Sequence, residues 1–300
     1  MIKRFLDYVE IRTKITSTFT FLMAIAFLLY QKQEIRWDLT LVFFIAMFLF
    51  DLTTTAINNY IDTKTNHQKL QFNRRTALII IYALFGMSAA LGLYLAYSTD
   101  IVILFVGGIC FLCGVLYTYG PIPISRQPLG EVLSGMFYGL LIPFILFYIN
   151  SSEGTYLSLY VNFKTISLNL QVWPLITLVL FAIIPFSVTA NIMLANNICD
   201  LDKDIAVKRH TLPYYIGRKA LGLFAGLYYV TYAATIVMVV LQILHPICLL
   251  SLVTIIPVQK NISVFFKKQE KAETFQCSIK SFILIMGAQV ITIGISAFVF

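Results

Sequence analysis

The most constraining feature of this chain is a series of apolar runs, each about as long as a lipid bilayer is thick. Crossing a membrane takes about 20 apolar residues, so each run predicts one spanning helix. The runs cover residues 15–31, 38–57, 76–96, 100–119, 129–149, 172–195, 218–243, 245–262 and 277–299. The 300 residues are 59% hydrophobic and 12% charged, which excludes an ordinary water-soluble domain. We predict one all-α polytopic membrane domain over residues 1–300, a bundle of about nine transmembrane helices without strands.

The basic residues lie mainly on alternate connections between the predicted helices. If the N-terminus is cytosolic, only Lys32, Arg36 and Lys164 of the 22 Lys and Arg residues fall on the outer side. This asymmetry predicts that the N-terminus faces the cytosol, because positive charge is retained there. The net charge of +8 therefore follows from topology. No basic run is interleaved with aromatic residues, so we expect no nucleic-acid partner.

Two further features predict no chemistry. The five cysteines are scattered, and no second pair complements Cys110 and Cys113, so we expect neither disulfides nor a zinc site. The first apolar run is followed by many similar ones, which argues against a cleaved leader. The outer segment 150–171 is polar and long enough for a short interfacial helix.

Two inner segments repeat one polar pattern. NNYIDTKTNHQK follows the second apolar run, and NNICDLDKDIAVKRHTL follows the sixth. The repeat pairs Asn58 with Asn196, Asp62 with Asp200 and Asn66 with Asp204, always at the same separation along the chain. We call Asn58, Asp62 and Asn66 the first ridge, and Asn196, Asp200 and Asp204 the second ridge. The repeat indicates two related halves, about residues 1–140 and 141–300.

The spacing of the ridges predicts a metal site. Residues four apart on a helix share one face, so each ridge would present a row of side-chain oxygens. Four predicted helices separate the two copies, so both emerge on the same side of the membrane and could face one cavity. Mg²⁺ prefers such oxygens and usually takes one or two carboxylates plus substrate phosphates. We predict that Asp62, Asn66, Asp200 and Asp204 hold Mg²⁺ and a phosphate. Alternatively, these polar residues are ordinary solvated helix ends, but that alternative explains less well why the same spacing occurs twice.

Cations lie beside both ridges and could neutralise a phosphate. Lys208 and Arg209 follow the second ridge, and Lys64 and Lys69 flank the first. His67 and His210 adjoin the ridges and could transfer protons, although loop histidines are more often simply solvated.

A third inner segment, YTYGPIPISRQPLGE, joins the fourth and fifth predicted helices. Its Gly and Pro residues mark a turn-rich loop. We interpret it as a lid that brings Tyr117, Tyr119 and Arg126 to the substrate, with Arg126 binding phosphate; alternatively it is a plain connector. Lys14, just before the first span, could line the same cavity or serve as a membrane anchor.

The segments NNICDLDKDIAVKRHTLPYYIGRKAL, YTYGP and VEIRTK resemble the UbiA superfamily of intramembrane aromatic prenyltransferases. Members carry two Asp-rich motifs on cytosolic segments of a nine-helix bundle, which correspond here to residues 58–66 and 196–204. The second motif is most similar to the branch that prenylates 1,4-dihydroxy-2-naphthoate in the menaquinone pathway. The resemblance covers essentially the whole chain.

The resemblance implies a reaction. Mg²⁺ held by the acids of both ridges, with Asn58 and Asn196 assisting, would bind the diphosphate of a polyprenyl donor, and Lys208 and Arg126 would neutralise the leaving group. An aromatic acceptor would then attack the allylic carbon, and a dihydroxynaphthoate acceptor would lose CO₂. The resemblance also implies a membrane-lipid environment, for which we expect the bacterial plasma membrane.

The sequence departs from the family pattern at four positions. Asn59 and Asn66 stand where the first motif usually has Asp, Cys199 where Arg is frequent, and Val207 where Gly is frequent. Asp62 is thus the only acid of the first ridge, and acceptors such as 4-hydroxybenzoate or haem remain alternatives to dihydroxynaphthoate.

A secondary transporter is the alternative from a different class. Asp51 and Glu131 would be its nearest candidates for charges within the membrane. The sequence contains no motif typical of nucleotide hydrolysis, dinucleotide binding or zinc proteolysis.

Overall fold

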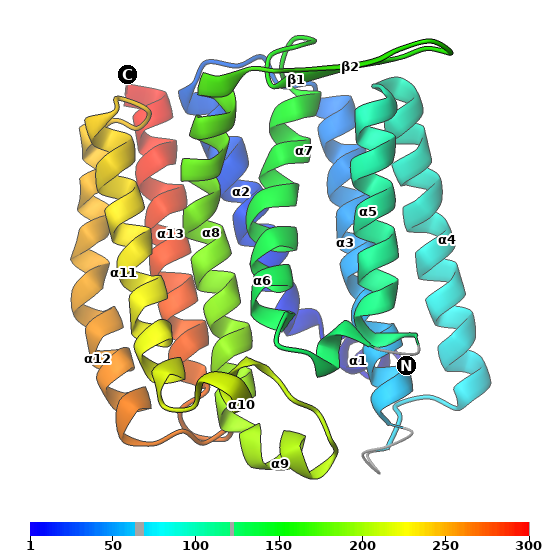
Figure 1. Ribbon diagram of the computed structural model, residues 1–300, viewed down its shortest axis with the longest axis vertical. Coiled ribbons are helices and arrows are strands. Elements are labelled where there is room, and N and C mark those ends of the chain that lie inside the picture. Colours follow the sequence, from blue (N-terminus) through cyan, green and yellow to red (C-terminus); the bar gives the residue numbers. More distant parts are fainter. Residues whose placement is uncertain (64–68, 121–122, 300) are drawn as a thin grey trace. The chain divides into compact units, whose positions relative to one another are not determined.

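The computed structural model describes residues 1–63, 69–120 and 123–299 of the chain (Figure 1). Within these residues, nine helices are long and apolar enough to span a membrane. They cover Ile11–Tyr30, Trp37–Asp62, Arg74–Ser98, Ile101–Thr118, Gly130–Ile149, Val172–Cys199, Lys219–Val240, Pro246–Lys267 and Gln276–Val299. They coincide in order with the nine apolar runs, so the predicted all-α membrane architecture is confirmed.

The helices form two compact units. The first unit contains Met1–Thr18 and Arg36–Ile124, and the second contains Phe19–Ile35 and Ser125–Phe300. Helix α2 (Ile15–Tyr30) begins in the first unit and continues in the second.

The first unit is built from α1 (Ile2–Tyr8), α3 (Trp37–Asp62), α4 (Arg74–Ser98) and α5 (Ile101–Thr118). Two helices begin at side-chain caps: Asn73 accepts a hydrogen bond from the backbone of Thr76, and Asp100 accepts one from the backbone of Val102. Helices α3 and α4 pack around a core of apolar residues that includes Leu52, Ala56, Ala77, Ile81 and Leu84. The core continues onto Tyr8 and Val9, so the N-terminal segment is part of the unit.

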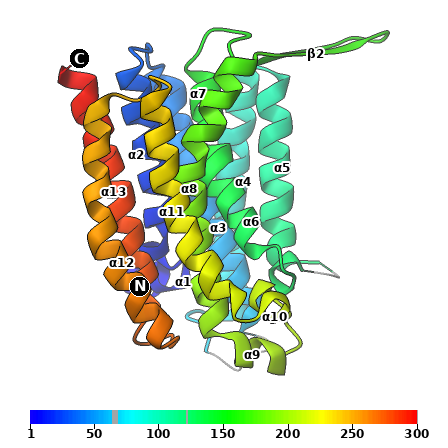
Figure 2. The same cartoon turned by 60° about the vertical axis from the view of Figure 1, so that its left-hand side comes forward.

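In the second unit, α8 (Val172–Cys199) packs against α11 (Lys219–Val240) and α13 (Gln276–Val299) (Figure 2). The fifth span comprises α6 (Gly130–Ser134), a π-helical segment (Gly135–Leu141) and α7 (Ile142–Ile149). The eighth span is a 3-10 helical stretch, Pro246–Thr254, that continues as α12 (Ile255–Lys267).

Buried polar side chains connect these helices from within. Asn191 on α8 donates to the carbonyl of Phe224 on α11 at 2.7 Å. Gln289 on α13 donates to the hydroxyls of Thr235 and Ser251, so it joins three elements. Such bonds are needed because no water satisfies polar groups inside a bilayer.

The outer segment 150–171 contradicts the sequence prediction. It forms an antiparallel hairpin of β1 (Leu157–Val161) and β2 (Ile166–Leu170), not an interfacial helix, so the expectation of no strands was wrong. Both strands alternate apolar and polar residues and contain β-branched ones, which favours a pleated backbone. Asn162 stabilises the turn, because its side-chain oxygen accepts hydrogen bonds from the backbone of Lys164 and Thr165.

Candidate functional site

The second ridge lies where α8 ends. Asn196 belongs to α8, Asp200 follows its last residue, and Asp204 lies in the short helix α9 (Leu201–Ala206). The Asp200 N–H donates to the Asn196 carbonyl at 3.1 Å, and the Asp204 N–H donates to the Asp200 carbonyl at 2.8 Å. Helical hydrogen bonding therefore runs through the boundary between α8 and α9, and the three residues occupy successive turns as the spacing predicted.

A tight turn after α9 brings a cation back to Asp204. Lys208 has a left-handed backbone with φ 57°. Its N–H donates to the Ile205 carbonyl at 3.0 Å, while the Arg209 N–H donates to the Asp204 carbonyl at 2.8 Å, which is a Schellman closure. The Arg209 guanidinium then lies 3.7 Å from a carboxylate oxygen of Asp204, whereas Lys208 is exposed. Arg209 is thus the cation that the fold places against the second ridge.

The second half of the lid segment packs against the same region. Arg209 Nε donates to the Ser125 carbonyl at 2.9 Å, and the His210 N–H donates to the Arg126 carbonyl at 3.2 Å. The Arg126 side chain is exposed. The backbone of residues 125–126 is therefore held beside the residues that follow Asp204.

A buried polar pair anchors the start of α6 to α8. The Asn197 amide donates to a Glu131 carboxylate oxygen at 2.8 Å, and these residues are 1% and 4% exposed. Asn197 is next in sequence to Asn196, the first residue of the second ridge, so this bond fixes the end of the lid segment beside that ridge.

Lys271 reaches the second ridge from the segment between α12 and α13. Its ammonium nitrogen lies 2.6 Å from Asp200 Oδ2 and also donates to the amide oxygen of Asn196. The sequence alone places Lys271 only among the basic residues of the inner side. The two partners are 71 residues apart, and no local pattern connects them.

The first ridge lies at the end of α3, where Asp62 is the last residue and is half-buried. The hydroxyl of Thr118 donates to the Asn58 side-chain oxygen at 3.1 Å. Thr118 stands between Tyr117 and Tyr119, so the first half of the lid segment contacts the first ridge; Tyr119 itself is exposed. Asn66, Lys64 and His67 lie outside the described residues.

Asn59, one of the departures from the family pattern, holds the N-terminal segment. Its amide donates to the Tyr8 carbonyl at 2.9 Å and to a Glu10 carboxylate oxygen at 3.1 Å. The Tyr8 hydroxyl donates to the Ala56 carbonyl, and burial raises the pKa of this phenol, which keeps it a donor. An Asp at position 59 would lack the amide donor, so Asn fits this contact.

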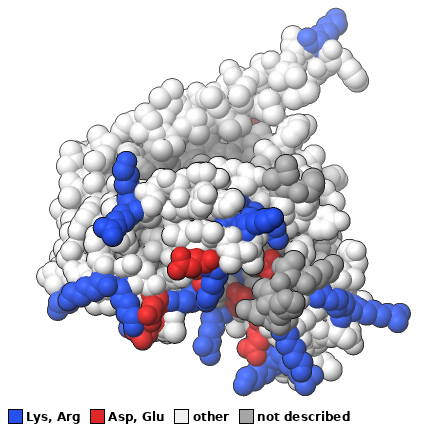
Figure 3. All heavy atoms as spheres, turned by 60° about the horizontal axis from the view of Figure 1, so that its bottom comes forward, with Lys and Arg blue, Asp and Glu red and all other residues white. Residues whose placement is uncertain are grey.

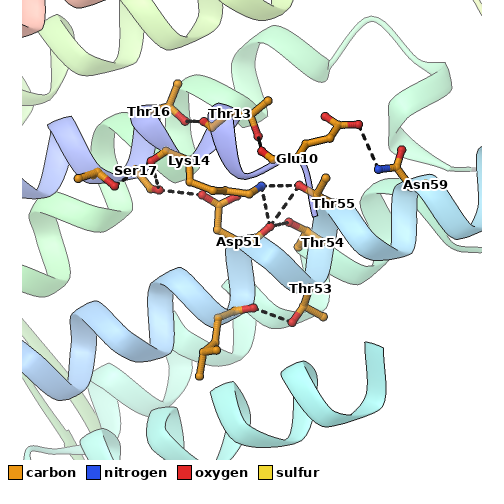
Figure 4. A network of polar contacts seen from close by, with 12 residues as sticks. Glu10, Thr13, Lys14, Thr16, Ser17, Asp51, Thr53, Thr54, Thr55 and Asn59 are labelled. Atoms are coloured by element: carbon orange, nitrogen blue, oxygen red, sulfur yellow. Dashed lines mark hydrogen bonds and ion pairs between the residues drawn. The ribbon is translucent and has the colours of Figure 1, made fainter. Parts of the chain in front are cut away.

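Lys14 forms a buried ion pair with Asp51 (Figure 4). Its ammonium donates to the Asp51 carboxylate at 2.9 Å, to the Asp51 carbonyl at 3.0 Å and to the Thr55 hydroxyl. Ser17 donates to the other carboxylate oxygen at 2.7 Å. Lys14 therefore joins the first residues of the first span to α3, and this network occupies the ammonium, for which the sequence allowed either a place in the substrate cavity or a role as membrane anchor.

The two candidate membrane charges of the transporter hypothesis are both engaged within the protein. Asp51 pairs with Lys14, and Glu131 accepts a hydrogen bond from Asn197. Figure 3 shows Lys and Arg side chains beside Asp and Glu side chains on the face that it turns toward the viewer.

The donor set of the second ridge fits Mg²⁺. Among the residues that the structure describes, no three His, Cys, Asp or Glu side chains form a metal cluster. The ridge instead offers two carboxylates and one amide oxygen on successive turns. Mg²⁺ characteristically takes one or two carboxylates and completes its shell with water and substrate phosphates, whereas a structural zinc site needs four protein ligands.

Fold and composition define an integral membrane protein of the helical class, with polar motifs at one end of each unit. A family model described as the UbiA prenyltransferase family matches residues 17–284. The chain therefore belongs to the UbiA prenyltransferase family, which confirms the resemblance seen in the sequence.

Known relatives agree with this membership. A 1,4-dihydroxy-2-naphthoate octaprenyltransferase of Bacillus subtilis (strain 168) is 29% identical over 159 residues, covering 53% of this chain and 45% of that protein. The match thus spans less than half the length of that relative.

Solved structures show the same fold. A UbiA homolog from Aeropyrum pernix K1 superposes with a TM-score of 0.66 at 16% identity, covering 95% of this chain and 98% of that one. A UbiA homolog from Archaeoglobus fulgidus, bound to DMAPP and Mg²⁺, superposes with a TM-score of 0.59 at 12% identity, covering 97% and 99%.

Proposed function

We propose that this protein transfers a polyprenyl group from an allylic diphosphate to 1,4-dihydroxy-2-naphthoate, with Mg²⁺ as cofactor. The observation that carries the proposal is the second ridge: two carboxylates and an amide oxygen on successive turns, with Arg209 and residues 125–131 held beside them. Two comparisons support it. The Bacillus relative is named for this acceptor, and the Archaeoglobus homolog was solved with a prenyl diphosphate and Mg²⁺.

The ridges would hold the metal and the donor's diphosphate. Asp62, Asp200 and Asp204 would supply carboxylates, and Asn58, Asn66 and Asn196 would supply amide oxygens. When bound, Mg²⁺ neutralises negative charge that develops on the diphosphate. Lys208 and Arg126, both exposed near Asp204, would place cations on the same group.

The protein's residues would lower the barrier to breaking the allylic C–O bond. The bonding electrons leave with the diphosphate, where Lys208 and Arg126 stabilise the new charge. The aromatic faces of Tyr117 and Tyr119 would stabilise the positive charge on the allylic carbon. The electron-rich ring carbon that bears the carboxylate then bonds to the allylic carbon. Loss of the carboxylate as CO₂ returns an electron pair to the ring and gives a prenylated naphthoquinol, the reduced form of a demethylmenaquinone-type product.

The membrane location suits these reactants. An apolar polyprenyl tail can lie among the helices, while the diphosphate stays at the polar helix ends. The distribution of Lys and Arg supports a cytosolic N-terminus and cytosolic ridges. We propose the bacterial plasma membrane as the location.

An assay of membranes that contain the protein tests this function. The membranes receive 1,4-dihydroxy-2-naphthoate, farnesyl or a longer polyprenyl diphosphate, and Mg²⁺, and products are identified by mass spectrometry with and without a chelator. We expect a prenylated, decarboxylated naphthoquinol that disappears with chelator. Product only with 4-hydroxybenzoate or another phenolic ring would overturn the acceptor, and no transfer to any ring would overturn the reaction.

Variants of the ridges test the metal role. Asp62→Asn and Asp200→Asn should each lower turnover at least about tenfold, the scale of losing a charged metal contact. Asp202→Asn is the matched control, because Asp202 is exposed in the same segment but is not part of the ridge pattern. Near-normal turnover in both ridge variants would contradict the metal assignment.

A further inference from the structure

The ammonium of Lys271 occupies the place on the second ridge where the proposed function puts a metal ion. It contacts Asn196 Oδ1 and lies 2.6 Å from Asp200 Oδ2, two oxygens on successive helical turns. The side chain of Lys271 is 39% exposed and that of Asp200 is 22% exposed. The pair is therefore at the surface of the ridge, with access to water.

A compact turn presents this lysine. Lys268 pairs with Glu270 at 3.0 Å and with Glu273 at 2.9 Å, which raises the pKa of Lys268. Thr274 is buried, and its hydroxyl accepts a hydrogen bond from the Glu270 N–H at 2.9 Å. These contacts order residues 268–275 without using Lys271, so its position on the ridge is an additional interaction of its side chain.

An ammonium and a divalent cation compete for the same carboxylate oxygen. Two positive charges within a few ångströms repel each other strongly at a partly buried site. Lys271 has another favourable environment, because its nitrogen also lies 5.0 Å from the centre of the Phe275 ring, and its side chain reaches water. It can therefore leave the ridge without losing every partner.

We propose that Lys271 is the resident counter-ion of the second ridge and must be displaced before a divalent metal binds there. The proposal rests on the proposed metal role of Asn196 and Asp200. A metal ion that binds alone must compete with Lys271 for Asp200. A diphosphate that arrives with the metal ion offers the displaced ammonium a new anionic partner. Metal and prenyl diphosphate then strengthen each other's binding, a coupling that is reciprocal by linkage.

The test is a titration of purified protein in detergent with Mn²⁺, followed by the loss of the free-ion EPR signal. The variants are Lys271→Met, Lys271→Arg and Lys267→Met. Lys267 is the matched control, because it is an exposed lysine at the end of α12 and its substitution changes the net charge equally. We expect Lys271→Met to bind Mn²⁺ alone about fivefold more tightly than the wild type, the scale of a partly exposed charge pair. Lys267→Met and Lys271→Arg should stay close to the wild type.

A second titration adds a non-reactive prenyl thiolodiphosphate. In the wild type the analogue should tighten Mn²⁺ binding, and in Lys271→Met this gain should be smaller by the same factor of about five. Equal Mn²⁺ affinity in Lys271→Met and wild type would overturn the proposal, as would a tightening of Mn²⁺ binding by about fivefold in the control variant Lys267→Met.

Asp200→Asn separates this inference from the proposed function. If Asp200→Asn loses Mn²⁺ binding but Lys271→Met does not gain it, the counter-ion role fails and the metal role stands. If Asp200→Asn binds Mn²⁺ as the wild type does, or if no variant binds it even with the analogue, the metal role of the ridge fails and the inference fails with it.

Discussion

Replacing Lys14 by Met should strongly destabilise the first unit, because it leaves the Asp51 carboxylate buried without its cation. The side chains of Lys14 and Asp51 are 3% and 5% exposed. Met has a similar length and apolar character but donates no hydrogen bond, so the substitution removes the donor to Asp51 and Thr55 with little change in packing.

The magnitude follows from the burial of the pair. Removing one partner of a buried ion pair costs about 3–5 kcal/mol, because the remaining charge loses its compensation. Ser17 still donates to Asp51 in the variant, which places the expected loss at the lower end, about 3 kcal/mol. Proteins are typically stable by about 5–15 kcal/mol, so a loss of about 3 kcal/mol would shift the unfolding transition measurably.

The assay is reversible unfolding of the purified protein in mixed micelles, compared among single and double variants. Lys14→Met combined with Asp51→Leu should recover much of the loss, since both charges leave together. Lys3→Met is the control for the change in net charge, because Lys3 is exposed on α1. A loss below about 1 kcal/mol in Lys14→Met, the scale of an exposed pair, would refute the reasoning.

The same variant also tests the candidate role of Lys14 in donor binding. If the ammonium serves the ion pair alone, the folded fraction of Lys14→Met should keep the wild-type KM for the prenyl diphosphate. A KM that rises at least about tenfold, which corresponds to about 1.4 kcal/mol of binding, would instead place Lys14 at the donor.

Three further substitutions give separate tests. Gly139→Ala would put a methyl group 2.2 Å from a backbone nitrogen of α8 and should destabilise the second unit by about 1–3 kcal/mol. Gly222→Ala is the control, because an added methyl group there has no atom within 4 Å. Equal melting temperatures of the two variants would contradict this prediction. Asn59→Asp should cost about 1–2 kcal/mol in unfolding experiments at pH 7, because it loses the donor to Glu10 and adds a like charge beside it; a free energy of unfolding equal to that of the wild type would contradict this. Lys208→Gly should raise the free energy of unfolding by up to about 1 kcal/mol, because glycine adopts the left-handed backbone at this position without strain. If Lys208 binds diphosphate as proposed, the same variant should raise the KM for the donor. An unchanged KM would contradict that role.

The membrane spans could be predicted because their cause is local. A bilayer requires about 20 consecutive apolar residues, and that requirement is visible in any window of the sequence. The expected span 172–195 corresponds to Val172–Cys199, and the expected span 277–299 to Gln276–Val299. The largest differences are at the second span, which continues to Asp62, and at the eighth, which continues to Lys267, because polar residues such as these are tolerated where a helix emerges from the membrane.

The hairpin was missed because two local signals conflicted. Segment 150–171 has the polarity and length of an interfacial helix, but its alternation of apolar and polar residues has the period of a strand. Asn162 decides between them, since its side chain satisfies the backbone N–H groups of a tight turn.

The sequence by itself determined the number and order of the helices, the family, and the register of the second ridge, because each depends on residues that are close along the chain. Only the tertiary structure decided which cation meets which acid. Lys14 pairs with Asp51, Arg209 rather than Lys208 lies against Asp204, and Lys271 reaches Asp200 from the last loop. The physical reason is that electrostatic and hydrogen-bond partners are selected by distance in space, over ångströms, and the closest cation in sequence need not be the closest in the fold.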